Sequence, residues 1–173
     1  PGYNYWCSFP GQGRSIDPEL YENDTLHTVK GYVTDLLTDR AIDFISEKRK
    51  KPFFLYLGHK AIHPDVKQLN NGALDLKSGS RYIPASRHEG TYKDAKIVRR
   101  KNAINDFSGI DSQSVVGQFL LKKKSPEIES QFGTTLDHFT SDKTIRERSE
   151  MLLAVDESLG RILQKLEEMK ILD

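Results

Sequence analysis

Apolar positions repeat at helical spacing in two parts of this chain. Between residues 34 and 49 they recur every three or four positions, which predicts a helix with one apolar face (Val33, Leu36, Leu37, Ala41, Phe44 and Ile45). The same spacing, after a capping-box pattern at 144–147, predicts a second helix over residues 144–169 (Leu152, Val155, Leu159, Ile162, Leu163 and Leu166). Each stripe is expected to need a wider sheet to cover it.

A continuous apolar run lies between these helices. Residues 53–57 read Phe-Phe-Leu-Tyr-Leu and do not alternate with polar positions, so they predict a strand buried on both faces, as in a parallel sheet covered by helices. Pro52 ends the first helix and Gly58 ends the strand. Residues 3–9 predict a short strand, whereas residues 64–140 give no readable pattern. A helix, a buried strand, an irregular insert and a second helix amount to half of an α/β layout.

The composition excludes several broad classes of protein. A length of 173 residues suits one domain, and a net charge of +1 gives no overall attraction to nucleic acid or to an anionic membrane. No apolar stretch has the length of a membrane span. The single cysteine, Cys7, excludes an internal disulfide and is interpreted as a buried structural thiol. The chain begins at Pro1 and ends at Asp173, just after a predicted helix, which favours an internal part of a longer protein, incomplete at both ends.

Polar residues follow the predicted strand at its carboxyl end, the edge where open α/β sheets bind ligands. Lys60 offers a compact cation for a phosphate, sulfate or carboxylate, and His63 can donate a proton near neutral pH. His59 and His63 have the spacing of two zinc ligands on a helix, but Pro64 disfavours helical backbone at His63 and no third ligand is evident. From spacing alone, an anion or acid–base site and an ordinary solvated loop both remain open.

Three stretches together resemble the catalytic domain of type I sulfatases in sequence, order and separation. They are GYVTDLLTDRAIDFI (31–45), KPFFLYLGHKAIHPD (51–65) and MLLAVDESLGRIL (151–163). Two shorter pieces are similar to flanking segments of bacterial sulfatases, namely FPGQGRSIDP (9–18) and IPASRHEGTY (83–92). The resemblance covers most of the chain, except for residues 93–142.

The resemblance implies an α/β fold like that of alkaline phosphatase, with a mostly parallel sheet flanked by helices, of which this chain would form part. It also implies hydrolysis of sulfate esters of glycans or aryl alcohols, and therefore a sulfated small molecule or glycan as partner, in a periplasmic or secreted protein. The family nucleophile is a formylglycine made from Cys or Ser in a Cys/Ser-x-Pro/Ala-x-Arg motif. Its calcium ion is held by paired aspartates and an Asp-Asn pair. These two groups supply covalent attack and Lewis-acid assistance in ester cleavage.

Carried over residue by residue, the resemblance gives this chain a partial site. His63 matches the family histidine that contacts the sulfate and is a candidate acid for the leaving oxygen, Lys60 lies near the substrate, and His59 has no firm role. Residues 8–12, Ser-Phe-Pro-Gly-Gln, begin like the nucleophile motif but end in Gln where Arg is required, and Cys7 has Phe at the Pro/Ala position. No calcium ligands are recognised, so we expect the chain alone not to hydrolyse an aryl sulfate.

Two other interpretations stay open. One keeps the fold and changes the chemistry to that of a phosphatase or phosphodiesterase of the same superfamily, which a bare Ser or Thr nucleophile would indicate. The other is a non-catalytic polyanion-binding protein that uses the basic runs at residues 99–101 and 122–124, although solvated surface charge is the simpler interpretation of both runs. The sequence fixes neither the particular sulfate ester nor the oligomeric state.

Overall fold

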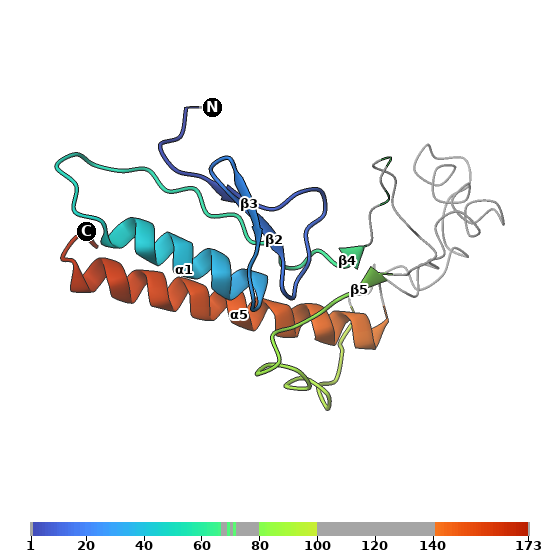
Figure 1. Ribbon diagram of the computed structural model, residues 1–173. Coiled ribbons are helices and arrows are strands. Elements are labelled where there is room, and N and C mark those ends of the chain that lie inside the picture. The colour runs from blue at the N-terminus through green and yellow to red at the C-terminus, as the bar shows by residue number, and fades with distance from the viewer. Residues whose placement is uncertain (1, 67–68, 70, 72–79, 100–140, 173) are drawn as a thin grey trace, which may run out of the picture.

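Residues 2–66, 69, 71, 80–99 and 141–172 are described by a computed structural model (Figure 1). Within these residues the chain forms two helices, α1 (Val33–Ser46) and α5 (Asp142–Glu168). One antiparallel sheet contains β1 (Cys7–Ser8), β2 (Glu19–Glu22) and β3 (Thr25–Thr28). A second antiparallel pair joins β4 (Asp65–Val66) to β5 (Ser80–Arg81). These elements make a partial α/β domain.

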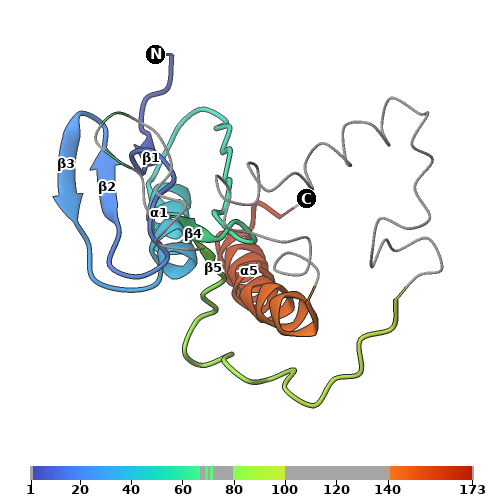
Figure 2. The same ribbon diagram turned by 90° about the vertical axis from the view of Figure 1, so that its right-hand side faces the viewer.

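The two helices lie side by side and run in the same direction (Figures 1 and 2). The apolar face predicted for the first helix is largely buried (Val33, Leu36, Leu37, Ala41 and Ile45). Tyr32, at the start of α1, packs in a buried cluster with Ala85 and Ala154, and its hydroxyl donates a hydrogen bond to the Ile83 carbonyl oxygen at 3.0 Å. The core therefore joins α1, the segment after β5 and α5, which are far apart in the sequence.

Both helix ends are set by local hydrogen bonds. The first helix ends at Ser46 rather than at residue 49, because the Arg49 guanidinium turns back and donates to the Phe44 carbonyl oxygen. Such a contact satisfies a carbonyl group that has no partner within the helix. The second helix begins at Asp142, two residues before the predicted start, because the Ser141 hydroxyl accepts a hydrogen bond from the backbone N–H of Thr144 at 3.1 Å.

The hairpin of β2 and β3 was not predicted from the sequence. Its two-residue connection, Asn23–Asp24, has Asn23 in the left-handed region at φ 52°. Asparagine adopts this conformation more readily than most residues and is typical of two-residue hairpin turns. The predicted strand at residues 3–9 is present in part, as β1, which pairs with β2.

The apolar run at residues 53–57 does not form the buried strand predicted for it. These residues belong to neither sheet within the described part of the chain, and they pass back over α1 (Figure 1). Phe54 and Tyr56 are 75% and 77% exposed, respectively. A strand is buried on both faces when it has neighbouring strands and helices on both sides. Among the described residues this run has no neighbouring strand, and only α1 lies against it, on one side.

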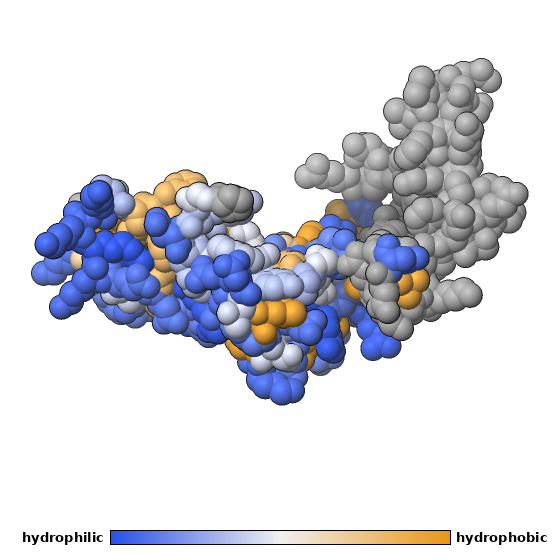
Figure 3. Space-filling view, turned by 45° about the horizontal axis from the view of Figure 1, so that its top comes forward, coloured by the Kyte–Doolittle hydropathy of each residue, from blue (hydrophilic) through white to orange (hydrophobic). Residues whose placement is uncertain are grey.

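Apolar surface is also left uncovered along α5. Leu152, Leu159 and Leu163 of the predicted stripe are exposed, whereas Met151, Ala154 and Ser158 form the buried face. Apolar side chains accordingly stand out within a mostly polar surface (Figure 3). The apolar stripe of α5 is therefore left partly uncovered, as expected, whereas the apolar face of α1 is already largely buried. Among the described residues, no helix is long and apolar enough to cross a membrane.

Candidate functional site

The residues predicted to carry chemistry lie together in one tight segment, residues 59–65, which we call the Lys60 turn. The segment follows the apolar run and leads directly into β4. The backbone N–H of His63 donates a hydrogen bond to the Lys60 carbonyl oxygen at 2.8 Å. This bond closes the turn between Lys60 and His63.

The Lys60 side chain points into the turn rather than into solvent. The residue is 5% exposed. Its ammonium donates to the Pro64 carbonyl oxygen at 2.8 Å, and it lies 3.3 Å from a carboxylate oxygen of Asp65. Burial lowers the pKa of Lys60, because the charged form loses water, and the Asp65 carboxylate opposes that shift. The ammonium thus holds the backbone around His63 in place.

Asp65 anchors the turn to the amino-terminal part of the chain. Its carboxylate accepts a hydrogen bond from the Ser15 hydroxyl at 2.6 Å and from the Ser15 backbone N–H at 2.9 and 3.0 Å to its two oxygens. Ser15 is fully buried, and its carbonyl oxygen accepts from the N–H of Val33 at the first residue of α1. The contacts therefore connect Lys60, Asp65, Ser15 and the start of α1 in one network.

His63 is exposed, in contrast to Lys60. Its Nδ1 lies 2.8 Å from the Pro64 carbonyl oxygen. A carbonyl oxygen can only accept, so Nδ1 must carry a proton in this contact, and the exchangeable position of the ring is Nε2. No hydrogen bond of Nε2 to another described residue is found. The Nε2 atom of His63 is therefore left without a partner among the described residues.

His59 is half-buried against the two helices. Its Nε2 lies 3.1 Å from the Ser158 hydroxyl, which is 2.6 Å from the Thr38 hydroxyl, and Thr38 in turn donates to the Thr34 carbonyl oxygen. Burial lowers the pKa of His59, partly opposed by Asp35, so the ring is favoured in its neutral form. His59 therefore ties the turn to α1 and α5, and these contacts give no support to a zinc site shared with His63.

An ion-pair cluster reinforces the same junction. The Arg87 guanidinium makes two hydrogen bonds to the Asp35 carboxylate, at 2.7 and 2.8 Å, and also binds Glu157 on α5. These two carboxylates raise the pKa of Arg87 further above its already high value. His88 Nε2 lies 3.1 Å from the same Glu157. Arg87, from the segment after β5, thus links Asp35 on α1 to Glu157 on α5.

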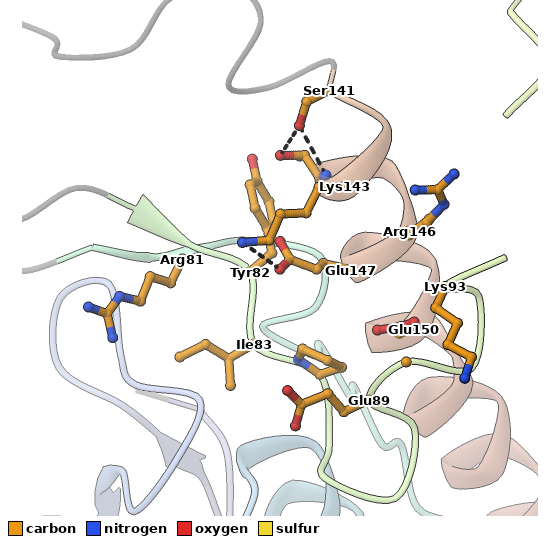
Figure 4. A pocket seen from close by; sticks show the side chains of 13 residues that line it. Arg81, Tyr82, Ile83, Glu89, Lys93, Ser141, Lys143, Arg146, Glu147 and Glu150 are labelled. Atoms are coloured by element: carbon orange, nitrogen blue, oxygen red, sulfur yellow. Dashed lines mark hydrogen bonds and ion pairs between the residues drawn. The ribbon is translucent and has the colours of Figure 1, made fainter. Parts of the chain in front are cut away.

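A cavity of about 630 Å³ opens beyond the turn, between residues 81–93 and the first turns of α5 at residues 141–150; we call it the α5 cavity. Its wall begins at Arg81, whose ladder partner in β4 is Asp65. Charged residues line the cavity on both sides (Arg81, Glu89, Lys93, Lys143, Glu147 and Glu150), and Figure 4 shows Lys143 and Glu147 pointing toward each other. The cavity therefore has a lining of both charged and apolar residues, and it begins beside the Lys60 turn.

The surroundings of Cys7 disfavour the thiolate form that a nucleophile requires. It is a free thiol and half-buried, rather than fully buried as expected. Burial raises the pKa of Cys7, with a further contribution from Glu22 and an opposing one from Arg40. A raised pKa lowers the thiolate fraction near neutral pH, and the thiolate is the reactive form.

The described residues do not fit the calcium ion or the formylglycine implied by the resemblance. Within residues 2–66, 69, 71, 80–99 and 141–172, no group of three His, Cys, Asp or Glu side chains is placed to hold a metal ion. Two carboxylates near the Lys60 turn already have protein partners. Asp65 accepts from Ser15 and pairs with Lys60, and Asp35 pairs with Arg87. The chemistry proposed below for this chain therefore involves neither group.

Sequence reasoning identified the turn but missed the residues that hold it. Ser15 and Ser158 are small and polar, and neither belongs to a local pattern that signals a site. Their partners are 50 and 99 residues away, respectively. Asp65 was a more accessible signal, because an acidic residue two positions after a candidate catalytic histidine suggests a charge partner within the loop.

The basic run at 122–124 lies outside the described residues, and Arg99 of the other run pairs with Asp142 at 2.6 Å.

Comparison with known proteins identifies the chain. It is 24% identical over 223 residues to N-acetylglucosamine-6-O-sulfatase of Bacteroides thetaiotaomicron, an alignment that covers 99% of this chain and 37% of that protein. It is 34% identical over 85 residues to the uncharacterized sulfatase YdeN of Escherichia coli, covering 42% of this chain and 15% of YdeN. The fold matches the structure of BT4656 in complex with its substrate D-glucosamine-2-N,6-O-disulfate, with a TM-score of 0.67 and 21% identity, over 100% of this chain and 42% of that one. The chain thus spans less than half the length of these proteins. The sulfatase family model matches residues 1–173, and the chain therefore belongs to the sulfatase family.

Proposed function

We propose that residues 1–173 form an internal part of the catalytic domain of a sulfuric ester hydrolase that acts on sulfated glycans. The observation that carries the proposal is the Lys60 turn, in which an exposed His63 is held by a buried network of Lys60, Asp65 and Ser15. A rigid loop that presents one free ring nitrogen is suited to proton transfer. One relative is an N-acetylglucosamine-6-O-sulfatase, and the structural neighbour is in complex with its substrate D-glucosamine-2-N,6-O-disulfate; both support a glycan ester as substrate.

His63 is assigned the role of general acid. When the ring is charged, Nε2 carries a proton that it can give to the oxygen of the leaving alcohol, while Nδ1–H stays bonded to the Pro64 carbonyl oxygen. Lys60 is assigned a substrate-binding role through its positive charge. Its ammonium is bonded to the Pro64 carbonyl oxygen and lies close to Asp65. In this arrangement Lys60 would act on a bound sulfate through the electrostatic potential of its charge and not through a direct contact.

The remaining parts of the proposal rest on family resemblance. Calcium and a formylglycine nucleophile would come from other segments of the protein, because the described residues hold no group of three metal-binding side chains and residues 8–12 end in Gln where the nucleophile motif requires Arg. A periplasmic or secreted location is proposed on the same ground. Separation of periplasm, medium and cytosol from cells that produce the full-length protein would test the location.

The role of His63 predicts a dependence on the leaving group. General acid catalysis contributes about 10²–10⁴-fold to rate, and an activated aryl leaving group needs it least. In the full-length protein, His63→Ala should therefore lower kcat far more for a sugar sulfate than for nitrophenyl sulfate. His27→Ala, which changes a histidine on β3, is the matched control and should leave both rates unchanged.

The same experiment separates the competing roles. Equal losses on both substrates for His63→Ala would mean that the residue binds sulfate without protonating the leaving group. A larger loss for His59→Ala would mean that the acid is the other histidine, contrary to its burial and its bond to Ser158. Turnover of nitrophenyl phosphate in place of nitrophenyl sulfate would favour a phosphatase of the same superfamily.

A further inference from the structure

The α5 cavity has the size and the mixed lining of a binding site for a polar ligand. Its volume of about 630 Å³ falls within the range of about 300–1,000 Å³ typical of ligand pockets. Carboxylates and cations both line it, including Glu147 and Glu150 from α5 and Lys93 from the segment after β5 (Figure 4). A ligand rich in hydroxyl groups can donate to the former and accept from the latter.

Glu150 brings a hydrogen-bond acceptor into the wall of the cavity. The residue as a whole is only 4% exposed, and one carboxylate oxygen accepts a hydrogen bond from the backbone N–H of Tyr92 at 3.0 Å. This bond fixes the position of the carboxylate in the cavity lining. Its other oxygen has no hydrogen-bond partner among the described residues. A ligand hydroxyl that enters the cavity could donate to this oxygen.

The charges around the cavity indicate that the ligand is also anionic. Arg81 and Lys93 are exposed at the wall, and neither has an ion-pair partner among the described residues. The other two cations of the wall are committed in part, since Lys143 lies 3.6 Å from Glu147 and Arg146 donates to the Ala95 carbonyl oxygen. A hydroxyl-rich ring with a sulfate or carboxylate substituent satisfies both the buried acceptor and the exposed cations.

The position of the cavity connects it to the Lys60 turn. Asp65 and Arg81 are directly paired in the β4–β5 ladder. Paired residues in an antiparallel ladder lie about 5 Å apart, so the wall of the cavity starts immediately beside the turn that presents His63. A chain of sugar rings with one sulfate at His63 would direct its next ring toward Arg81 and the cavity.

We propose that the α5 cavity binds the saccharide ring next to the sulfated ring of the substrate, with Glu150 accepting a ring hydroxyl and Lys93 facing an anionic substituent. This inference rests on the proposed sulfatase function and adds to it a preference for an acidic oligosaccharide over a single sulfated sugar.

The test compares a short and a long substrate in the full-length protein. The two substrates are glucosamine 6-O-sulfate and an acidic disaccharide that contains it. Glu150→Gln keeps the shape of the side chain and the acceptor for Tyr92, while Lys93→Ala changes an exposed residue and preserves the fold. Loss of one hydrogen bond to a charged group corresponds to about tenfold or more in kcat/KM. Each variant should lose about tenfold on the disaccharide and less than twofold on the monosaccharide.

Matched controls and a binding measurement complete the test. Glu167→Gln, an exposed position on α5, and Lys50→Ala, an exposed position after α1, should leave both substrates unaffected. The affinity for the desulfated disaccharide, measured by calorimetry, should weaken by about tenfold in Glu150→Gln and in Lys93→Ala. It should not change in the two control variants. Equal losses on both substrates, or unchanged disaccharide binding in both variants, would overturn the subsite. If the unmodified protein turns over neither sulfate, the proposed function fails, and the calorimetric comparison still decides whether the cavity binds the sugar.

Discussion

Asp65 is predicted to be the residue on which the Lys60 turn depends most strongly. The substitution Asp65→Asn removes the negative charge next to the Lys60 ammonium and keeps an oxygen that can accept from Ser15. The Lys60 side chain is 1% exposed, so its charge would remain buried without a counter-charge. Breaking a buried pair in this way costs about 3–5 kcal/mol. Because the Pro64 carbonyl oxygen still accepts from the ammonium at 2.8 Å, we expect a smaller loss of about 2–3 kcal/mol in the free energy of unfolding.

The pH dependence of this loss identifies its cause. Burial places the pKa of Lys60 in the folded state below that in the unfolded state, about 10.4. Between those two values the unfolded state binds more protons, so stability rises as pH increases through that window. Without Asp65 the folded-state pKa falls further and the window widens toward neutral pH. The difference between Asp65→Asn and the unmodified protein should therefore be largest near pH 7 and should narrow as pH approaches 10.

The assay is urea unfolding of the full-length protein, followed by circular dichroism at several pH values from 7 to 10. Asp17→Asn is the matched control, because Asp17 also pairs with a lysine, Lys30, but at an exposed position. It should change stability little at any pH. A loss below about 0.5 kcal/mol for Asp65→Asn at pH 7, or a loss that stays constant up to pH 10, would refute the argument that Asp65 compensates a buried charge.

Two further predictions concern packing. Phe54, Tyr56 and the leucines of α5 leave apolar surface exposed, so the chain produced alone should associate or unfold without a cooperative thermal transition, and a monodisperse monomer in light scattering with a sharp transition would contradict this. Arg87→Ala removes the contacts to Asp35 and Glu157 and should lower stability by on the order of 1 kcal/mol, since all three side chains are partly exposed. The Tm of the full-length variant measures this, and an unchanged Tm would show that the cluster is not a structural link.

The sequence determined the features that depend on residues close together along the chain. The two helices follow from apolar residues three and four positions apart, and their observed bounds differ from the predicted ones by one to three residues. The two larger shifts involve side chains at the helix ends: Ser141 caps the start of α5, and Arg49 bonds to the Phe44 carbonyl oxygen at the end of α1. The motifs from residue 31 to 65 and from 151 to 163 also sufficed to indicate the sulfatase family, which the match over residues 1–173 confirmed.

The tertiary structure decided which of the predicted polar residues are exposed and which are buried. In the sequence Lys60 and His63 are two polar residues of one loop, and nothing in the pattern distinguishes which of them is exposed. Their difference arises from Asp65 and from Ser15, which is 45 positions before Lys60 and provides a buried anchor for the turn. The sequence pattern likewise predicted burial of residues 53–57, but an apolar run is buried only where other strands or helices lie against it. Burial and ionisation depend on neighbours in space, and for the Lys60 turn most of these neighbours are distant in the sequence.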